Sequence, residues 1–184
     1  MVGEDFAAVL AAAQAGDEMA FSRLWRDGNP ALLRYLRVLA PDRAEDIASE
    51  TWVRVVRGLA DFRGDEMAWR AWLFTTARRR LVDDARRRAR RPEAPLDEDA
   101  AARLTEPGDA ADAALERIGT QAMIQLLARL PRPQAEVILL RVVGGLDTET
   151  VARMTDRSPG AVRVAAHRGL RRLAEIMAAE GVTL

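Results

Sequence analysis

The sequence predicts an all-α protein made of two small helical domains. Apolar residues recur at the three- and four-residue spacing of helices through most of the chain, and no useful length alternates with the period of a strand. Between two such helical portions, residues 92–112 are rich in proline, alanine and acidic residues, which is typical of a flexible linker. We therefore expect one domain at 1–91, an acidic flexible linker at 92–112 and a second domain at 113–184.

The first domain is expected to contain a series of amphipathic helices. A helix at 5–15 ends at a glycine, Asp17 caps a second helix, and Asn29-Pro30 interrupts that helix before it resumes over 31–39. Asp42 and a glutamate three residues later fit a capping box, and the helix that they begin extends to about residue 59. A long arginine-rich helix follows a glycine loop. The residues expected to face the core in these last two helices are Ala44, Ile47, Ala48, Thr51, Val55 and Leu59, and then Leu73, Ala77, Leu81 and Ala85.

The second domain is expected to end in a helix-turn-helix. Helices at 115–130 and 134–143 precede a short helix that Asp147 can cap. After a turn at 155–157, Ser158 is an N-cap candidate, and a proline occupies the first position of a final helix. Short helix, tight turn and longer helix are the helix-turn-helix pattern. The final helix directs Val162, Ala166, Gly169, Leu170 and Leu173 inward, and Arg163, Val164, His167, Arg168, Arg171 and Arg172 outward.

The composition argues against several classes of protein. The chain has no cysteine and a single histidine, so we expect no disulfide, no metal site and no cofactor. It offers no nucleophile–base pair and no phosphate-binding glycine loop, so we expect no catalytic residues. No apolar run is long enough to span a bilayer, and acidic residues stand at the N-terminus where a signal peptide needs positive charge. These features predict a soluble cytoplasmic protein with no membrane insertion.

Charge is distributed unevenly along the chain, although the formal net charge is zero. Residues 76–91 carry eight arginines against two aspartates, and residues 157–173 carry five arginines and no acid. Residues 92–116, between them, carry eight acids against one arginine. Two basic segments of this kind favour a nucleic-acid partner that the net charge conceals.

The two basic segments predict different kinds of nucleic-acid contact. Residues 61–91 combine the arginine run with Phe62, Trp69, Trp72 and Phe74. Aromatic rings stack on unpaired bases and arginines bind phosphate, so this segment favours a surface for partly single-stranded nucleic acid. Trp69 and Trp72 share a helix face, which also fits simple packing. In the second segment the final helix is placed as a recognition helix, whose N-terminal residues contact base edges in the DNA major groove.

With both patterns in place, the chain resembles the extracytoplasmic-function (ECF) sigma factors of bacterial RNA polymerase, group IV of the sigma-70 family. The resemblance covers about residues 5–178, and four segments carry it. They are GDEMAFSRLW at 16–25, AEDIASETWVRVVR at 44–57, FRGDEMAWRAWLFTTARRRLVDDARRR at 62–88 and LPRPQAEVILLRVVGGLDTETVARMTDRSPGAVRVAAHRGLRRL at 130–173. The resemblance implies a protein that binds core RNA polymerase and directs promoter-specific transcription initiation at −35 and −10 elements.

The resemblance also assigns roles to segments and residues. Segment 44–57 looks like the helix that binds the coiled coil of the polymerase β′ subunit, segment 62–88 like the part that melts and reads the −10 element, and segment 130–173 like the −35 reader. The implied partners are core RNA polymerase, through its β′ and β subunits, promoter DNA and an anti-sigma factor. The implied contacts are Asp46, Glu50, Val53, Arg54 and Arg57 for the polymerase; Phe62, Arg63, Gly64, Asp65, Trp72, Arg78, Arg79, Arg80, Arg86 and Arg87 for the −10 element; and Ser158, Arg163, Val164, His167, Arg168 and Arg171 for the −35 element.

The chain departs from the family pattern at two places. The family often has asparagine where this chain has Arg79, which bears on how the −10 element is read. It often has threonine and arginine where this chain has Ala161 and Ala165. The second departure implies the loss of a DNA contact and a −35 preference unlike that of relatives.

Other functions remain open at this stage. A helix-turn-helix regulator could bind DNA without being a polymerase subunit, but it would need a dimerisation surface, and no long heptad helix is present. An interaction module that sequesters a partner is a further alternative, in which the basic faces are incidental. An enzyme is the weakest alternative, because one histidine and no cysteine leave little acid–base chemistry near neutral pH beyond carboxylates.

Overall fold

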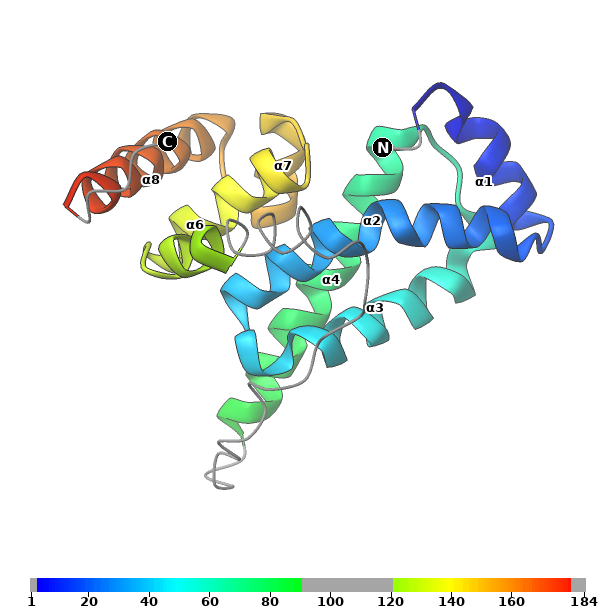
Figure 1. Cartoon of the computed structure of the whole chain (residues 1–184), viewed down its shortest axis with the longest axis horizontal. Helices are drawn as coiled ribbons and strands as arrows, with labels where there is room; N and C mark the ends of the chain where they lie inside the picture. The colour runs from blue at the N-terminus through cyan, green and yellow to red at the C-terminus, as the bar shows by residue number, and fades with distance from the viewer. Residues whose placement is uncertain (1–2, 91–120, 180–184) are drawn as a thin grey trace, which may run out of the picture.

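The computed structural model of the chain describes residues 3–90 and 121–179. All regular structure in these two ranges is helical, which confirms the predicted all-α class. The helices form an N-terminal and a C-terminal group that lie side by side, with α2 reaching from one to the other (Figure 1). The expected linker at 92–112 lies outside the described residues.

The N-terminal group begins its main helices at aspartate caps. The Asp17 carboxylate accepts hydrogen bonds from the backbone N–H groups of Met19 and Ala20, as predicted. Asp65 caps α4 in the same way, through the N–H of Ala68. In chain order the elements are η1 (Gly3–Asp5), α1 (Phe6–Gln14), α2 (Glu18–Leu39), η2 (Pro41–Arg43), α3 (Ala44–Gly58), η3 (Leu59–Asp61) and α4 (Glu66–Ala89).

The predicted interruption at Asn29-Pro30 is wrong, because α2 runs through Pro30. A proline inside a helix removes one hydrogen bond and costs about 3 kcal/mol. Packing on both sides of it outweighs that cost, since Leu24 and Leu32 are fully buried. The Asn29 side chain also accepts a hydrogen bond from Trp52 Nε1 at 2.9 Å, which joins this point of α2 to α3.

The predicted capping box at Asp42 does not form. Pro41–Arg43 make a short 3-10 turn, η2, and α3 begins at Ala44 without a side-chain cap. Glu45, the expected partner of Asp42, instead accepts from Arg37 of α2 at 2.9 Å. An ion pair with α2 has therefore taken the place of the expected side-chain hydrogen bond to the backbone.

The predicted core residues of α3 are confirmed, and those of α4 need one change. Ala44, Ile47, Ala48, Thr51, Val55 and Leu59 are all buried. In α4, Leu73, Ala77 and Leu81 are buried, but Ala85 is exposed and Asp84 is buried in its place. On a helix of 3.6 residues per turn, the three four-residue steps from Leu73 to Ala85 turn the side chain by about 120° away from the starting face. The eleven-residue step from Leu73 to Asp84 turns it by only about 20°. Asp84 therefore lies below Leu73, and Ala85 lies off the core face.

The C-terminal group ends in the predicted helix-turn-helix. Its described elements are a helical stretch at 121–128, α6 (Arg132–Ile138), the π-helical turn η5 (Leu139–Val143), α7 (Thr148–Thr155) and α8 (Pro159–Ala179). The first part of the helix expected at 115–130 lies outside the described residues. The next helix begins at Arg132 rather than at residue 134, because Pro133 occupies its first turn, where a missing N–H is tolerated.

One residue of α8 lies on a different face from that expected. Leu170 is 50% exposed, although it was expected to face the core. Ala165, where the family often has arginine, is buried. The buried row runs through Val162, Ala165, Gly169 and Leu173, at the three- and four-residue steps of a helix face. Gly169 approaches α6 so closely that a Cβ there would lie 2.7 Å from Ile138 Cδ1.

The two groups meet where α2 and α4 face α6 and η5. Tyr35 is fully buried, and its ring meets that of Phe74 edge-on with the centroids 5.5 Å apart. The Tyr35 hydroxyl donates to Glu136 Oε1 at 3.3 Å, and Arg78 Nε donates to the same oxygen at 2.9 Å. Burial, and then the Glu136 carboxylate, raises the pKa of Tyr35 well above its ordinary value. Across residues 3–90 and 121–179, no helix has both the length and the apolar character needed to cross a membrane.

Candidate nucleic-acid interface

The helix-turn-helix is held by local side-chain bonds at each of its bends. The Asp147 carboxylate accepts from the Thr150 backbone N–H, and this bond and one to the Thr150 side chain lower the pKa of Asp147. Asp156 ends α7 in the left-handed conformation, with φ of 56°, which aspartate tolerates better than most residues. Ser158 Oγ accepts from the Ala161 N–H at 3.1 Å and caps α8, as predicted. These bonds set the start of α8 relative to α7.

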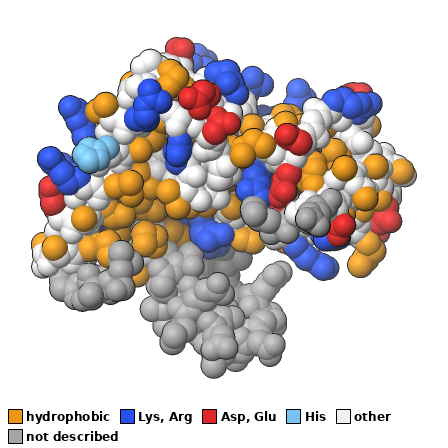
Figure 2. Space-filling view, turned by 90° about the horizontal axis from the view of Figure 1, so that it is seen from above, with side chains coloured by type: hydrophobic (Ala, Val, Ile, Leu, Met, Phe, Trp, Pro, Cys, Tyr) orange, Lys and Arg blue, Asp and Glu red, His pale blue; other side chains and the backbone are white. Residues whose placement is uncertain are grey.

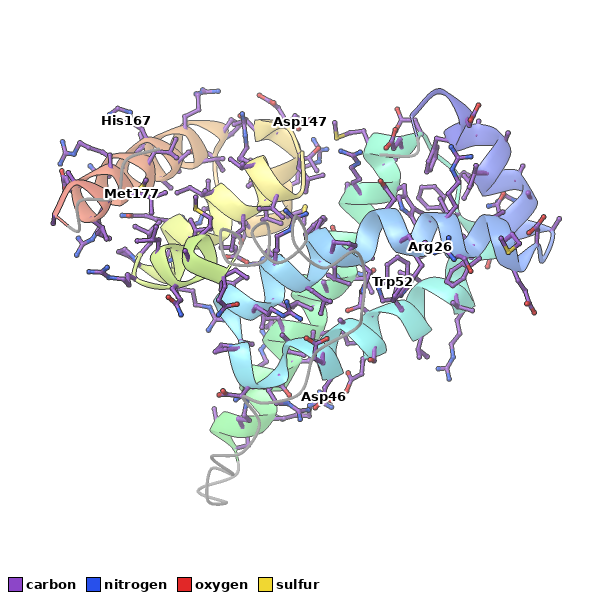
Figure 3. The ribbon with its side chains drawn as sticks, viewed as in Figure 1. Arg26, Asp46, Trp52, Asp147, His167 and Met177 are labelled. Atoms are coloured by element: carbon purple, nitrogen blue, oxygen red, sulfur yellow. The ribbon has the colours of Figure 1, made fainter. Side chains whose placement is uncertain are left out.

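The outer face of α8 is a free, basic surface. The predicted contact residues on this helix, Arg163, Val164, His167, Arg168 and Arg171, are all exposed. Figure 2 shows arginines gathered around the single histidine, and Figure 3 places His167 on the side of α8 away from α6. Arg171 pairs with Glu175 at 3.3 Å, and because both side chains are exposed this pair contributes little to stability.

Four aromatic rings from α1, the 59–65 loop and α4 form one cluster. Phe62 stacks on Trp72 with the ring centroids 5.1 Å apart, and Trp69 meets both rings at steeper angles. Phe6 of α1 closes the cluster against Trp69. Phe62 is half-buried in this arrangement, so its ring packs against the other rings of the cluster and is not free to stack on a base.

The loop between α3 and α4, residues 59–65, is fixed by side chains from outside and inside it. Gln14 Nε2 of α1 donates to the carbonyls of Leu59 and Phe62 at 2.9 and 2.8 Å. Arg63 donates to the carbonyls of Ala60 and Phe62. Gly64 has φ of 153°, and a Cβ there would lie 2.6 Å from Ala68 Cβ. The loop is therefore preformed before any ligand arrives.

The predicted −10 arginines of α4 differ in how far they are already paired. Arg78 binds Glu136, whereas Arg80 and Arg87 each lie 3.9 Å from Glu50 Oε2. Arg86 lies 4.0 Å from Asp83. Arg79 is exposed and makes no ion pair with any described residue. The most available of these cations is therefore at the position where the sequence departs from the family pattern.

Comparison with known proteins assigns the family. Residues 24–91 match the family model for Sigma-70 region 2, and residues 120–173 match that for Sigma-70, region 4. The ECF RNA polymerase sigma factor SigD of Mycobacterium tuberculosis (strain ATCC 25618 / H37Rv) is 35% identical over 187 residues, which cover 98% of this chain and 88% of SigD. The chain belongs to the ECF sigma factors. It is thus an RNA polymerase sigma factor that directs promoter-specific initiation, as predicted, and a separate helix-turn-helix regulator is not favoured.

Other relatives agree with this assignment. The ECF RNA polymerase sigma factor BldN of Streptomyces coelicolor (strain ATCC BAA-471 / A3(2) / M145) is 32% identical over 90% of this chain and 63% of BldN. The sigma factor RpoE of Bartonella quintana, solved with the anti-sigma factor NepR, has a TM-score of 0.63 at 24% identity and covers 85% of this chain and 96% of that one. CnrH, solved with the cytosolic domain of CnrY, has a TM-score of 0.62 at 21% identity and covers 96% and 99%. These two likenesses show the shared fold.

The predicted polymerase-binding residues of this sigma factor lie along α3. Val53 is 51% exposed, and Arg54 and Arg57 are exposed beside it. Asp46 pairs with Arg43 at the start of the helix, where Figure 3 shows it near the end of α4. Glu50 points toward the α4 arginines instead, so it belongs to both predicted surfaces.

Sequence reasoning missed Asp84, which organises the basic end of α4 in the sigma factor. Its carboxylate is buried, with Arg43 Nε at 3.6 Å, Arg87 Nη2 at 3.8 Å and Arg88 Nη2 at 2.8 Å. The Arg88 contact lies outside hydrogen-bond geometry, so these are ion pairs. The eleven-residue step from Leu73 is the signal that would have indicated its burial. Gln14 and Glu136 were also missed, because their partners lie 45 to 101 residues away.

Proposed function

We propose that this sigma factor divides promoter recognition between its two helical groups. The outer face of α8 reads the −35 element in the major groove, with Arg163, Val164, His167, Arg168 and Arg171 at the DNA and Ser158 at the phosphate-facing helix start. The observation that carries this assignment is the free basic face at the start of a capped recognition helix. Arginine there can make bidentate contacts to guanine.

The −10 element is assigned to the 59–65 loop and α4. Arg63, Gly64 and Asp65 lie at the exposed rim of a preformed loop, backed by the Phe62–Trp72 stack. A fixed loop loses little entropy when it captures an unpaired base. The arginines Arg78, Arg79, Arg80, Arg86 and Arg87 follow along α4 and bind the phosphates of the opening strand. The proposed domains are 1–91 and 113–184, and linking them at 92–112 raises the effective concentration of the second contact once the first is made.

The exposed face of α3 is the proposed site for core polymerase. Val53 gives this face an apolar centre, and Asp46, Glu50, Arg54 and Arg57 surround it with charge. We assign β′ to this face and β to the C-terminal group. The polymerase then supplies all covalent chemistry, this chain has no catalytic role of its own, and the complex works in the cytoplasm.

An anti-sigma factor is the proposed regulatory partner. RpoE of Bartonella quintana was solved in complex with the anti-sigma factor NepR, and its fold matches most of this chain. We infer a partner of the same class here.

Transcription in vitro tests the proposal. Core polymerase with this protein should produce start sites on a genomic promoter library that core polymerase alone does not produce. Arg163→Ala combined with Arg168→Ala should weaken use of the upstream element by about tenfold or more, at about 1–3 kcal/mol for each lost base contact. Arg34→Ala, an exposed arginine of α2 outside both surfaces, is the matched control.

Two outcomes would contradict these assignments. If no protein-dependent start sites arise, the promoter mechanism is wrong for this chain. If selectivity at the upstream element survives both arginine changes, α8 is not the reader. Binding to promoter DNA should also weaken with salt, with a log–log slope of roughly −0.9 per phosphate contact.

A further inference from the structure

The outer face of α8 begins with small and apolar side chains, although arginines dominate the rest of it. The exposed residues of this kind in its first two turns are Pro159, Gly160, Ala161 and Val164. Val164 is the largest of them and is 50% exposed. A face proposed to meet DNA thus starts with side chains that can neither donate nor accept a hydrogen bond.

The Val164 side chain points away from the protein core. Each residue turns an α-helix by about 100°, so Val164 lies about 160° from Val162 and about 180° from Leu173, both of which are buried. Arg171 follows on nearly the same line, two turns further along α8 and only about 20° away. Val164 therefore occupies the middle of the face that carries the arginines.

Gly160, one turn before Val164, is a glycine that the protein itself does not require. A Cβ built there would have Ser158 Oγ, at 3.9 Å, as its nearest described atom outside the neighbouring backbone, and its φ is not in the left-handed region. Gly169 differs, since a Cβ there would lie 2.7 Å from Ile138 Cδ1. Glycine weakens a helix relative to alanine, and its main use apart from special φ values is to let another group approach closely. At Gly160 that group must come from outside the chain.

The arginines nearest Val164 leave α8 on opposite sides of it. Arg168 lies about 40° to one side and Arg163 about 100° to the other. Neither forms an ion pair with any residue that the structure describes, so both are available to base acceptors or phosphates. Polar contacts at the two sides leave Val164 facing the base edges between them.

The major groove presents one apolar group to a protein, which is the C5 methyl group of thymine. The other groups at base edges are mainly hydrogen-bond donors and acceptors, and a valine placed against one of them leaves it without a partner. A valine placed against the thymine methyl removes apolar surface from water, which favours binding. The side chain at the middle of this face therefore favours thymine at the base pair that it meets.

We propose that Val164 reads the 5-methyl group of a thymine in the −35 element, and that Gly160 and Ala161 give the base access to it. The proposal rests on the assignment of α8 to the −35 element and adds the identity of one base. Arg163 and Arg168 hold the helix in the groove through polar contacts, and Val164 supplies the discrimination at this base pair.

The first test changes the DNA and leaves the protein as it is. The full chain with core polymerase selects upstream elements from a promoter library, and each thymine of a selected duplex is then replaced by deoxyuridine. Deoxyuridine pairs with adenine as thymine does and lacks only the methyl group. One of these replacements should weaken binding by about 2- to 5-fold, because the burial of one methyl group is lost.

The second test asks whether Val164 is the residue that meets this methyl group. Val164→Ala removes two methyl groups from an exposed side chain and should weaken binding to the thymine duplex by about 3- to 10-fold. In this variant, deoxyuridine at the same position should change binding by less than about 1.5-fold, since the two partners of one contact are not additive. Leu170→Ala is the matched control, because Leu170 is also 50% exposed but lies about 120° from Val164. With Leu170→Ala the deoxyuridine effect should keep its full size.

Three outcomes would overturn the proposal. Binding that is insensitive to deoxyuridine at every thymine would show that no methyl group is read. A deoxyuridine effect that keeps its size in Val164→Ala would assign the methyl contact to another residue. A Val164→Ala variant that weakens thymine and deoxyuridine duplexes equally would place Val164 against polymerase or the DNA backbone. Failure of the underlying function looks different, because no upstream sequence would then be selected at all and α8 would not be the reader.

Discussion

At the scale of single residues, Gln14 shows how one side chain shapes a distant loop. It stands on α1, yet its amide donates to the carbonyls of Leu59 and Phe62 in the loop proposed to hold a −10 base. Within the loop, the Leu59 carbonyl accepts from the Phe62 N–H and the Phe62 carbonyl from Arg63, so Gln14 adds a second donor to each and ties the loop to α1. Gln14 is therefore a positioning residue for the loop.

Removing this amide should affect −10 recognition more than −35 recognition. Gln14→Ala removes two hydrogen bonds, one to each carbonyl, and should lower the free energy of unfolding by about 1–3 kcal/mol, at about 0.5–1.5 kcal/mol for each bond. It should also weaken binding to DNA that is single-stranded at the −10 element, while binding to a −35 duplex stays the same. Gln125→Ala, at an exposed position of the 121–128 helix, is the control. Unchanged binding to single-stranded −10 DNA would show that loop geometry is unimportant.

At the scale of elements, α4 joins a packing helix to a cationic one. Its first turns bury Trp69, Leu73 and Phe74, and its last turns carry a dense set of arginines. Asp84 lies under those arginines and pairs with two of them, Arg87 and Arg88, and also with Arg43 of the turn before α3. One buried carboxylate thereby keeps mutually repelling cations on a single short stretch of helix.

Two neighbouring aspartates of α4 make a matched comparison. Asp84→Ala should lower the free energy of unfolding by about 1–3 kcal/mol, since three arginines lose the buried carboxylate with which they form ion pairs but can still reach water. Asp83→Ala should change it by less than about 1 kcal/mol, because its pair with Arg86 is exposed. Denaturant unfolding of both variants measures the difference. Equal effects would show that Asp84 does not organise this end of α4.

At the scale of the whole molecule, the contact between the helical groups depends on groups that titrate. Tyr35 faces Glu136 and Arg132 from α6 and Arg78 from α4. Burial is the main cause of its raised pKa. Burial of the neutral phenol is favourable, and burial of a phenolate beside a carboxylate is not. Contact between the helical groups is therefore more stable while Tyr35 keeps its proton.

The pH dependence follows from the sign of this shift. A pKa that is raised where the two groups are in contact contributes stability that is fully present below the ordinary tyrosine value of about 10. That stability is lost as the pH rises through the raised value. Because Tyr35 is the only tyrosine, its phenolate absorbance can be followed directly in the full chain. We expect phenolate formation to coincide with separation of fluorophores attached at Ser49→Cys of α3 and Ala174→Cys of α8, two exposed positions. In Glu136→Gln the titration should move toward lower pH, and a titration that does not move would contradict the assigned contact.

The parts of the fold that were predicted correctly are those decided by near neighbours in the chain. Asp17, Asp147 and Ser158 cap their helices through bonds to N–H groups two or three residues away, and such bonds leave a direct pattern in the sequence. The core face of α3 could be predicted equally well, because six apolar or small residues repeat at helical spacing. The family assignment rests on the order of such local patterns.

The errors occurred where a distant segment changed a local preference. Pro30 predicts an interruption, but packing of Leu24 and Leu32 keeps α2 continuous. Asp42 and Glu45 predict a capping box, but the Glu45 carboxylate instead accepts a hydrogen bond from Arg37 of α2. In α8, the exposure of Leu170 was decided by which face of the helix met α6. In each case the competing contact was with a residue that local spacing does not reveal.

The sequence by itself determined that the chain is helical, where its helices are capped, which faces are basic and to which family it belongs, because each of these depends on residues a few positions apart. Only the tertiary structure decided that Arg78 is paired with Glu136, that Gln14 holds the Phe62 loop and that Asp84 lies beneath the α4 arginines. Those pairs depend on which helix faces meet once the apolar stripes are buried. That packing is a property of the whole chain, because it brings together residues that are far apart in the sequence.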